Sequence, residues 1–153
     1  MNDRWKPNVT VAAMIERNGQ FLLVEEQTRD GLRFNQPAGH LDPGESLLHA
    51  ASREALEETA YEFTPESLLG IYQFKGGADD ITYMRFCFTG SASGPVPGRT
   101  LDTGIVRAVW MNVDEIRATA SRHRTPLVMR CIEDYLAGRR YPLNLIHHEN
   151  EGR

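Results

Sequence analysis

The chain has 153 residues, 41% of them hydrophobic, which suits a single domain, 1–153, with a sizeable core. Its formal net charge of −4 provides no broad basic surface, so we do not expect a nucleic acid polymer as a partner. Two cysteines without metal-ligand spacing indicate reduced thiols in a cytoplasmic protein, and we expect neither a signal peptide nor a membrane span.

The first predicted elements form a hairpin. Residues 8–15 are β-branched and alternating, as in a strand, and Asn18-Gly19 is a strong turn signal. The return strand is expected over 20–26, and the polar residues 27–32 are expected to form a loop.

An extended segment and a helix follow. Pro37 limits the segment 33–41 to an irregular or edge strand. The stretch 47–59 contains no Gly or Pro and is rich in helix formers, and Ser46 can cap its start. A helix is therefore predicted over 47–59.

The second half of the chain predicts further strands and two helices. After a turn at 62–67, strands are expected over 68–75, 81–89 and 106–112, with loops at 76–80 and 90–104. Asp114 is expected to cap a short helix to about 120, and Gly138 to stop a helix over 127–137. The tail 147–153 is polar and expected to fray. Strands, a helix, strands and helices without βαβ repetition predict an α+β fold with a mixed or antiparallel sheet.

Three carboxylates share one face of the predicted helix 47–59. Glu54, Glu57 and Glu58 stand at i, i+3 and i+4. On an exposed helix such neighbours repel weakly, but in a partly buried cleft the cost rises to about 3 kcal/mol per pair, which favours a bound cation. A solvated acidic face is the alternative, and the three glutamates by themselves do not exclude it.

The wider spacing resembles the Nudix box, the signature of the Nudix hydrolases. Its residues are Gly39, then Glu45 after five residues, then Arg53-Glu54 after seven, and then Glu57-Glu58. One position departs from the pattern: Ala60 stands where the family usually has Gly, so the end of the helix is expected to be slightly altered. The segments Phe34–Leu41, 124–128 and 139–143 further resemble the NudJ branch, and the resemblance covers about 5–146.

The resemblance implies an α/β/α sandwich with a mixed sheet and a metal-dependent hydrolase that uses Mg²⁺ or Mn²⁺. Metal ligands are expected at Gly39, Glu54, Glu57 and Glu58, with Glu54 also orienting or deprotonating the attacking water. Arg53 lies about 100° from the acidic face and is expected to form a bidentate pair with Glu45, tying the loop to the helix.

Residues that contact substrate are less clearly marked. Arg33, Phe34, His40 and Arg85 are candidates, although arginines are more often surface charges and aromatic residues in strands more often core. Weaker candidates of the same kinds are Lys75, Arg107, Phe74 and Tyr83. Asp102, in the predicted loop 90–104, could add a carboxylate, but a solvated loop acid is the preferred interpretation.

Three functions fit these observations. The branch resemblance implies hydrolysis of nucleoside di- and triphosphates or of hydroxymethylpyrimidine diphosphate by a monomer or homodimer. An ADP-ribose or dinucleoside-polyphosphate pyrophosphatase is the alternative within the family, because fold and box do not fix substrate. A non-catalytic nucleotide-binding module is the third, and the intact glutamates argue against it.

Overall fold

A computed structural model describes residues 3–76 and 79–151. The predicted loop 76–80 and the predicted tail 147–153 therefore lie partly outside the described residues. The strands in chain order are β1 (Asn8–Arg17), β2 (Gln20–Thr28), β3 (Gly31–Asn35), β4 (Ala38–His40), β5 (Glu62–Lys75), β6 (Thr82–Ser93) and β7 (Ile105–Asn112). The helices are α1 (Leu47–Thr59), α2 (Val113–Ala118) and α3 (Leu127–Leu136), with 3-10 turns η1 (Ala120–Arg122) and η2 (Leu143–Leu145).

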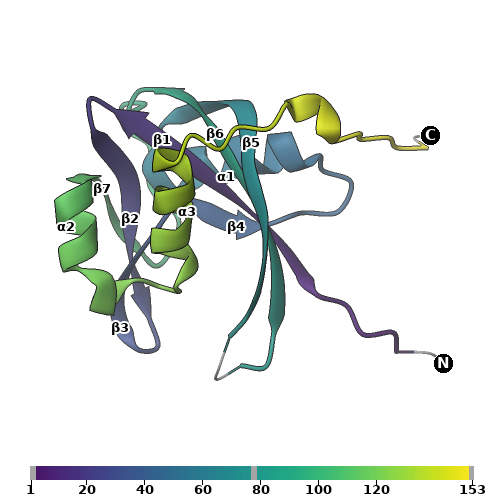
Figure 1. Ribbon diagram of the computed structural model, residues 1–153, viewed down its shortest axis with the longest axis horizontal. Helices are drawn as coiled ribbons and strands as arrows, with labels where there is room; N and C mark the ends of the chain where they lie inside the picture. Colours follow the sequence, from purple (N-terminus) through teal and green to yellow (C-terminus); the bar gives the residue numbers. More distant parts are fainter. Residues whose placement is uncertain (1–2, 77–78, 152–153) are drawn as a thin grey trace.

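The described strands form one mixed sheet in the order β3-β2-β1-β6-β5, with β4 paired to β1 and β7 paired to β2 (Figure 1). The central strands β1 and β6 are parallel, whereas β1 is antiparallel to β2 and β4. The hairpin β1–β2 turns at Asn18-Gly19, where both residues have positive φ angles of 53° and 79°, as a two-residue hairpin turn requires. The predicted hairpin and the predicted mixed sheet are confirmed.

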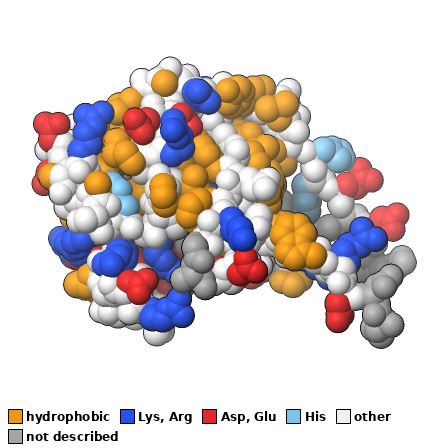
Figure 2. Space-filling view, turned by 60° about the horizontal axis from the view of Figure 1, so that its bottom comes forward, with side chains coloured by type: hydrophobic (Ala, Val, Ile, Leu, Met, Phe, Trp, Pro, Cys, Tyr) orange, Lys and Arg blue, Asp and Glu red, His pale blue; other side chains and the backbone are white. Residues whose placement is uncertain are grey.

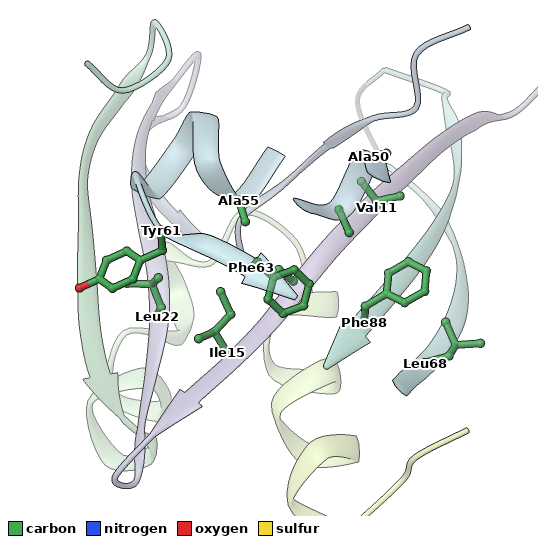
Figure 3. Packing of buried hydrophobic residues seen from close by; sticks show 11 residues of the cluster. Val11, Ile15, Leu22, Ala50, Ala55, Tyr61, Phe63, Leu68 and Phe88 are labelled. Carbon is green, nitrogen blue, oxygen red and sulfur yellow. The ribbon is translucent and has the colours of Figure 1, made fainter. Parts of the chain in front are cut away.

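Alternation along β1 divides the core into two layers. Val11, Ala13 and Ile15 pack towards α1, while Ala12 and Met14 pack on the face covered by α2 and α3. In Figure 3 the side chains of the first layer converge between the strands and the helix α1. Helices on both faces of the sheet make the α/β/α sandwich that the resemblance implied.

Helix α1 begins and ends close to its predicted positions. The Ser46 hydroxyl accepts a hydrogen bond from the His49 amide at 3.1 Å and caps the first turn. Ala60, at the position that departs from the family pattern, adopts φ 66° and ψ 11°, and its amide donates to the Leu56 carbonyl. Ala60 thus takes the left-handed conformation that glycine usually supplies, and the helix ends with a C-terminal cap all the same.

Strands β5 and β6 are longer than predicted. The predicted turn at 62–67 is wrong, since these residues begin β5, and the predicted loop 90–104 is wrong over its first residues, which extend β6. The two strands pair along their whole length with irregularities near Pro65 and Leu68. A side chain at Gly90 would collide with the Thr64 carbonyl, so the glycine that suggested a loop instead permits close approach of the two strands.

Three smaller boundaries also differ. The predicted loop 27–32 shrinks to two residues, because β2 continues to Thr28 and β3 starts at Gly31. Asn112 rather than Asp114 caps α2, forming a reciprocal capping box with Glu115, and α2 ends at Ala118. Helix α3 ends at Leu136, one residue earlier than predicted, and Gly138 follows the C-cap Ala137 with a φ angle of 83°, as its predicted role as stop signal requires.

The molecular surface mixes both signs of charge. On the face shown in Figure 2, hydrophobic side chains gather near the middle, and Lys and Arg side chains are interspersed with Asp and Glu around them.

Among the helices of the described residues, none has the length and apolar character needed to cross a membrane.

Candidate active site

The acidic face of α1 lies directly against Gly39 on the short strand β4. A Cβ at Gly39 would overlap the Glu54 carboxylate, so only glycine leaves room for this side chain. Gly39 pairs with Val11 of β1, in the middle of the sheet. The sheet and the helix together therefore place the backbone of β4 at Gly39 beside the buried side chain of Glu54.

The Arg53 guanidinium joins the loop before α1 to the acidic face. It binds Glu45 with two hydrogen bonds, from Nε at 2.6 Å and from Nη2 at 2.9 Å, which is the bidentate pair predicted from the sequence. Nη1 also donates to Glu54 at 2.9 Å and to Glu57 at 3.0 Å. Arg53 is thus not confined to Glu45 as its helical position suggested, because its long side chain reaches round to the acidic face. Nη2 further donates to the His40 carbonyl at 3.0 Å, next to Gly39.

Charge and burial shift the pKa values of these groups in opposite directions. The hydrogen bonds from Arg53 lower the pKa of Glu45 to about 2, and Glu45 in turn raises the pKa of Arg53. Burial raises the pKa of Glu54 despite its contact with Arg53. Burial, together with the charges of Glu54 and two more distant acids, raises the pKa of Glu58 to about 8. One guanidinium faces several carboxylates here, so Arg53 cannot neutralise all of them when they are ionised.

Asp102 is exposed, as the preferred interpretation of a solvated loop acid requires, and its carboxylate also lies within the acidic cluster. Carboxylate oxygens of Glu54, Glu57 and Asp102 lie within 4.8 Å of one another. The loop after β6 brings Asp102 there, because the Asp102 amide donates to the Glu57 carbonyl at 2.9 Å and the Arg99 side chain donates to the Leu56 carbonyl at 3.3 Å. The Asp102 amide thereby pairs the Glu57 carbonyl at the end of α1, whereas Arg99 is a second donor to the Leu56 carbonyl, which already accepts from the Ala60 amide.

No signal in the sequence marked this contact. Asp102 stands 45 positions beyond Glu57 in the sequence, in a stretch rich in Gly, Pro, Ser and Thr. Only the unpaired carbonyls at a helix end offer a general reason for a loop to return there.

Glu58 is turned towards the backbone of β4. Its Oε1 accepts a hydrogen bond from the Ala38 amide at 3.0 Å, and only 9% of the residue is exposed. Glu58 is not in the group of three, but Glu54 and Asp102 are close enough to raise its pKa. The four acids therefore share one electrostatic environment.

The residues present fit a hard divalent cation. All the side-chain donors are carboxylate oxygens, which Mg²⁺ and Mn²⁺ prefer, and three of them converge within 4.8 Å. The glycine cradle beside Glu54 is a further sign, because it keeps a side chain out of the space next to the carboxylate. Burial is the main cause of the raised pKa values of Glu54 and Glu58, and repulsion between the acids adds to it; a cation would offset both by stabilising the ionised carboxylates.

Two of the predicted substrate residues lie away from open surface. Phe34 is 3% exposed, and the Arg122 guanidinium covers its ring at 4.6 Å from the centroid, so the ring is not open to a base. Arg85 is 6% exposed, and its guanidinium binds side chains of the protein. Both side chains are buried because they face the core between the sheet and α3.

The other two candidates are accessible. His40 is exposed next to Gly39, with its ring 6.4 Å from the ring of Tyr83 on β6 and its Nε2 3.4 Å from Asn8 Nδ2. Arg33 is partly exposed and donates to the neighbouring Leu32 carbonyl at 3.0 Å. Of these candidates, His40 is next to the acidic cluster in the chain.

Comparisons with known proteins agree with this architecture. A family model described as NUDIX domain matches residues 4–131. Phosphatase NudJ of Escherichia coli (strain K12) is 38% identical over 142 residues, covering 93% of this chain and 92% of that protein.

Solved structures give the same result. A NUDIX hydrolase from Nitrosomonas europaea is 55% identical, with a TM-score of 0.94 over 96% of this chain and 100% of that one. A MutT NUDIX hydrolase from Burkholderia pseudomallei, 20% identical, has a TM-score of 0.72 over 85% of this chain and 98% of that one, and shares the fold.

Proposed function

The chain belongs to the NUDIX family, and on this premise we propose that it hydrolyses a diphosphate linkage in nucleoside di- or triphosphates or in hydroxymethylpyrimidine diphosphate, with Mg²⁺ or Mn²⁺ as cofactor. The observation that supports this most directly is the convergence of Glu54, Glu57 and Asp102 beside the Gly39 cradle. The similarity to Phosphatase NudJ supports the choice of substrate class.

The cation would be held by the Gly39 carbonyl and by the carboxylates of Glu54, Glu57 and Glu58. We add Asp102 to this proposed set, because its carboxylate lies within 4.8 Å of those of Glu54 and Glu57. When bound, such a cation neutralises charge on the diphosphate and acidifies water. Glu58 has its Oε2 available for this role, since only Oε1 binds the Ala38 amide. Asp102→Asn should then weaken Mn²⁺ binding without unfolding the chain.

Glu54 is the proposed general base. Burial raises its pKa towards neutral pH, which increases its strength as a base, and Arg53 holds its Oε1 and leaves the other oxygen to accept a proton from the attacking water. The bidentate pair with Glu45 keeps Arg53 in place, so Glu45 and Arg53 orient the base rather than exchange protons.

The substrate is proposed to lie beside His40 and Tyr83. Both rings are partly exposed, and His40 follows Gly39 directly in the chain. A flat pyrimidine or purine ring can stack on such side chains while its diphosphate reaches the acidic cluster. We further propose a cytoplasmic protein, in keeping with its two free cysteines, that acts as a monomer or homodimer on small molecules.

A substrate panel tests the proposal. The panel comprises nucleoside di- and triphosphates, hydroxymethylpyrimidine diphosphate, ADP-ribose and a dinucleoside polyphosphate, with released phosphate and pyrophosphate measured separately. We expect turnover of the first two classes that stops with a chelator and returns with Mg²⁺. A rate indifferent to metal would contradict the proposal, preferred cleavage of ADP-ribose or the dinucleotide would select the alternative pyrophosphatase, and nucleotide binding without turnover would indicate a binding module.

A further inference from the structure

Arg85, on β6, is a buried cation with an unusual set of partners. It is 6% exposed, and its guanidinium forms no ion pair with any carboxylate in residues 3–76 and 79–151. Burying a charge without a countercharge costs free energy unless hydrogen bonds compensate. A buried arginine without a countercharge therefore contributes little to stability, and we look to its hydrogen-bond partners for its role.

These contacts lead to one short segment of backbone. Nη2 donates to the Asn35 side-chain carbonyl at 2.9 Å, and Nη1 donates to the Gln36 side-chain carbonyl at 3.0 Å. Nη1 also lies 3.8 Å from the Cys131 sulfur on α3. Asn35 is the last residue of β3 and Gln36 follows it, and successive side chains of an extended chain normally point to opposite faces. One guanidinium that binds both side chains therefore restrains the bend between β3 and β4.

The same segment continues without a break to the acidic cluster. Gln36 is fully buried and its Nε2 donates to the Val128 carbonyl on α3 at 2.9 Å. The Pro37 carbonyl accepts from the Ala13 amide on β1 at 2.9 Å. The Ala38 amide then donates to Glu58, and Gly39 provides the cradle for Glu54. Each residue from 36 to 39 thus has at least one defined contact, and Gln36, the first of them, binds both Val128 and Arg85.

We propose that Arg85 is a positioning residue for the segment 35–39. It holds Asn35 and Gln36 so that Ala38 and Gly39 meet the glutamates of α1. The inference rests on the proposed function, because it takes Gly39 and the glutamates as the metal site. Loss of the guanidinium frees the segment 35–36 while β4 remains paired to β1. The metal site should therefore loosen without loss of the fold. Substitutions of residues that orient metal ligands typically cost about 10–100-fold in metal affinity.

The test is Mn²⁺ binding to the full chain, measured by electron paramagnetic resonance without substrate. Arg85→Gln should raise the Mn²⁺ dissociation constant by about 10–100-fold. Its turnover, low at limiting metal, should recover towards the parent value when Mn²⁺ saturates. A defect in global folding would not be rescued in this way. Arg122→Gln is the matched control, since Arg122 covers Phe34 on the same strand but contacts neither Asn35 nor Gln36, and its Mn²⁺ affinity should equal that of the parent.

A second pair of variants covers the case in which Arg85→Gln does not fold. Asn35→Ala removes one of the two restrained side chains and should weaken Mn²⁺ binding, whereas Asn35→Asp keeps an acceptor for Arg85 and should bind as the parent does. Parental affinity in both Arg85→Gln and Asn35→Ala would overturn the inference alone. A parent chain that takes up no Mn²⁺ would overturn the proposed function and the inference with it.

Discussion

Arg53 and Arg85 both contact the segment 35–40 around Gly39, but the protein surrounds them in opposite ways. Arg53, on α1, contacts the carboxylates of Glu45, Glu54 and Glu57, and its side chain is 20% exposed. Arg85, on the α3 side of the sheet, is 6% exposed and binds two neutral amides and a thiol. Arg53 moderates a charge excess, while Arg85 restrains backbone through uncharged groups.

The sequence distances differ as sharply as the chemistry. The glutamate partners of Arg53 are one, four and eight residues away, whereas the side chains that Arg85 contacts are 46 to 50 residues away. Helix periodicity can therefore indicate the first network but not the second. The difference teaches that some contacts of a charged site lie close together in the sequence and are visible as a motif, whereas others join distant segments and form only in the folded chain.

Among the residues that Arg53 contacts, removing the charge of the proposed base Glu54 should have the largest effect on turnover. Glu54→Gln keeps the shape of the side chain and a hydrogen bond acceptor for Arg53 but cannot accept a proton. We expect turnover to fall by about 10²–10⁴-fold, the usual contribution of a general base, with an unchanged circular dichroism spectrum. Glu62→Gln, an exposed change at the start of β5, is the control. Near-normal turnover of Glu54→Gln would show that Glu54 is not the general base.

Replacing the guanidinium group of Arg53 should lower turnover by a smaller factor. Arg53→Lys keeps the charge but cannot bind Glu45 at two points while reaching Glu54 and Glu57. We expect kcat to fall by about 10–100-fold, as for other residues that orient metal ligands. Steady-state kinetics at saturating Mg²⁺ would show it. If Arg53→Lys matched the parent, the charge of Arg53 would matter and its geometry would not.

The pH dependence of stability tests the charge excess that Arg53 leaves uncompensated. The pKa of Glu58 rises from 4.5 to about 8 in the folded, metal-free chain, chiefly through burial. Between these values the folded chain holds a proton that the unfolded chain has released, so the free energy of unfolding should fall as pH rises through this window. Urea denaturation with a chelator present at several pH values measures this.

The matched variant for this experiment is Glu58→Gln, in which this contribution to the slope should vanish. Added Mg²⁺ should also reduce the slope in the parent, because a cation stabilises the ionised carboxylates. An identical slope in Glu58→Gln and the parent would show that Glu58 does not titrate in this range.

The smallest effect is expected at the end of α1, beyond both arginine networks. Ala60→Gly relieves the cost of a left-handed conformation, about 1–2 kcal/mol, but loses backbone restraint and a buried methyl group. We expect a gain of at most about 1 kcal/mol in unfolding free energy, with turnover unchanged. Ala55→Gly, buried within the same helix, should have the opposite sign. A fall in stability in both variants would mean that the methyl group at Ala60 outweighs the conformational cost.

Much of the fold followed from local signals in the sequence. The turn Asn18-Gly19, the cap Ser46 and the stop Gly138 act through their own backbone and nearest neighbours, and the structure confirms them. The long pairing of β5 with β6 could not be predicted, because Pro65 and Gly90 are loop signals unless a partner strand lies alongside.

Within the site, the sequence by itself determined that Glu54, Glu57 and Glu58 share a helix face, since helix geometry places residues three and four apart on one side. The resemblance to the Nudix box added the pair of Arg53 with Glu45, which lies in the loop before the helix. Only the tertiary structure decided that Asp102 lies beside Glu54 and Glu57 and that Arg85 binds Asn35 and Gln36, upstream of Gly39. Those contacts join segments far apart in the chain. They form only once the sheet has brought β3, β4 and β6 together and the Asp102 amide has paired the Glu57 carbonyl at the end of α1.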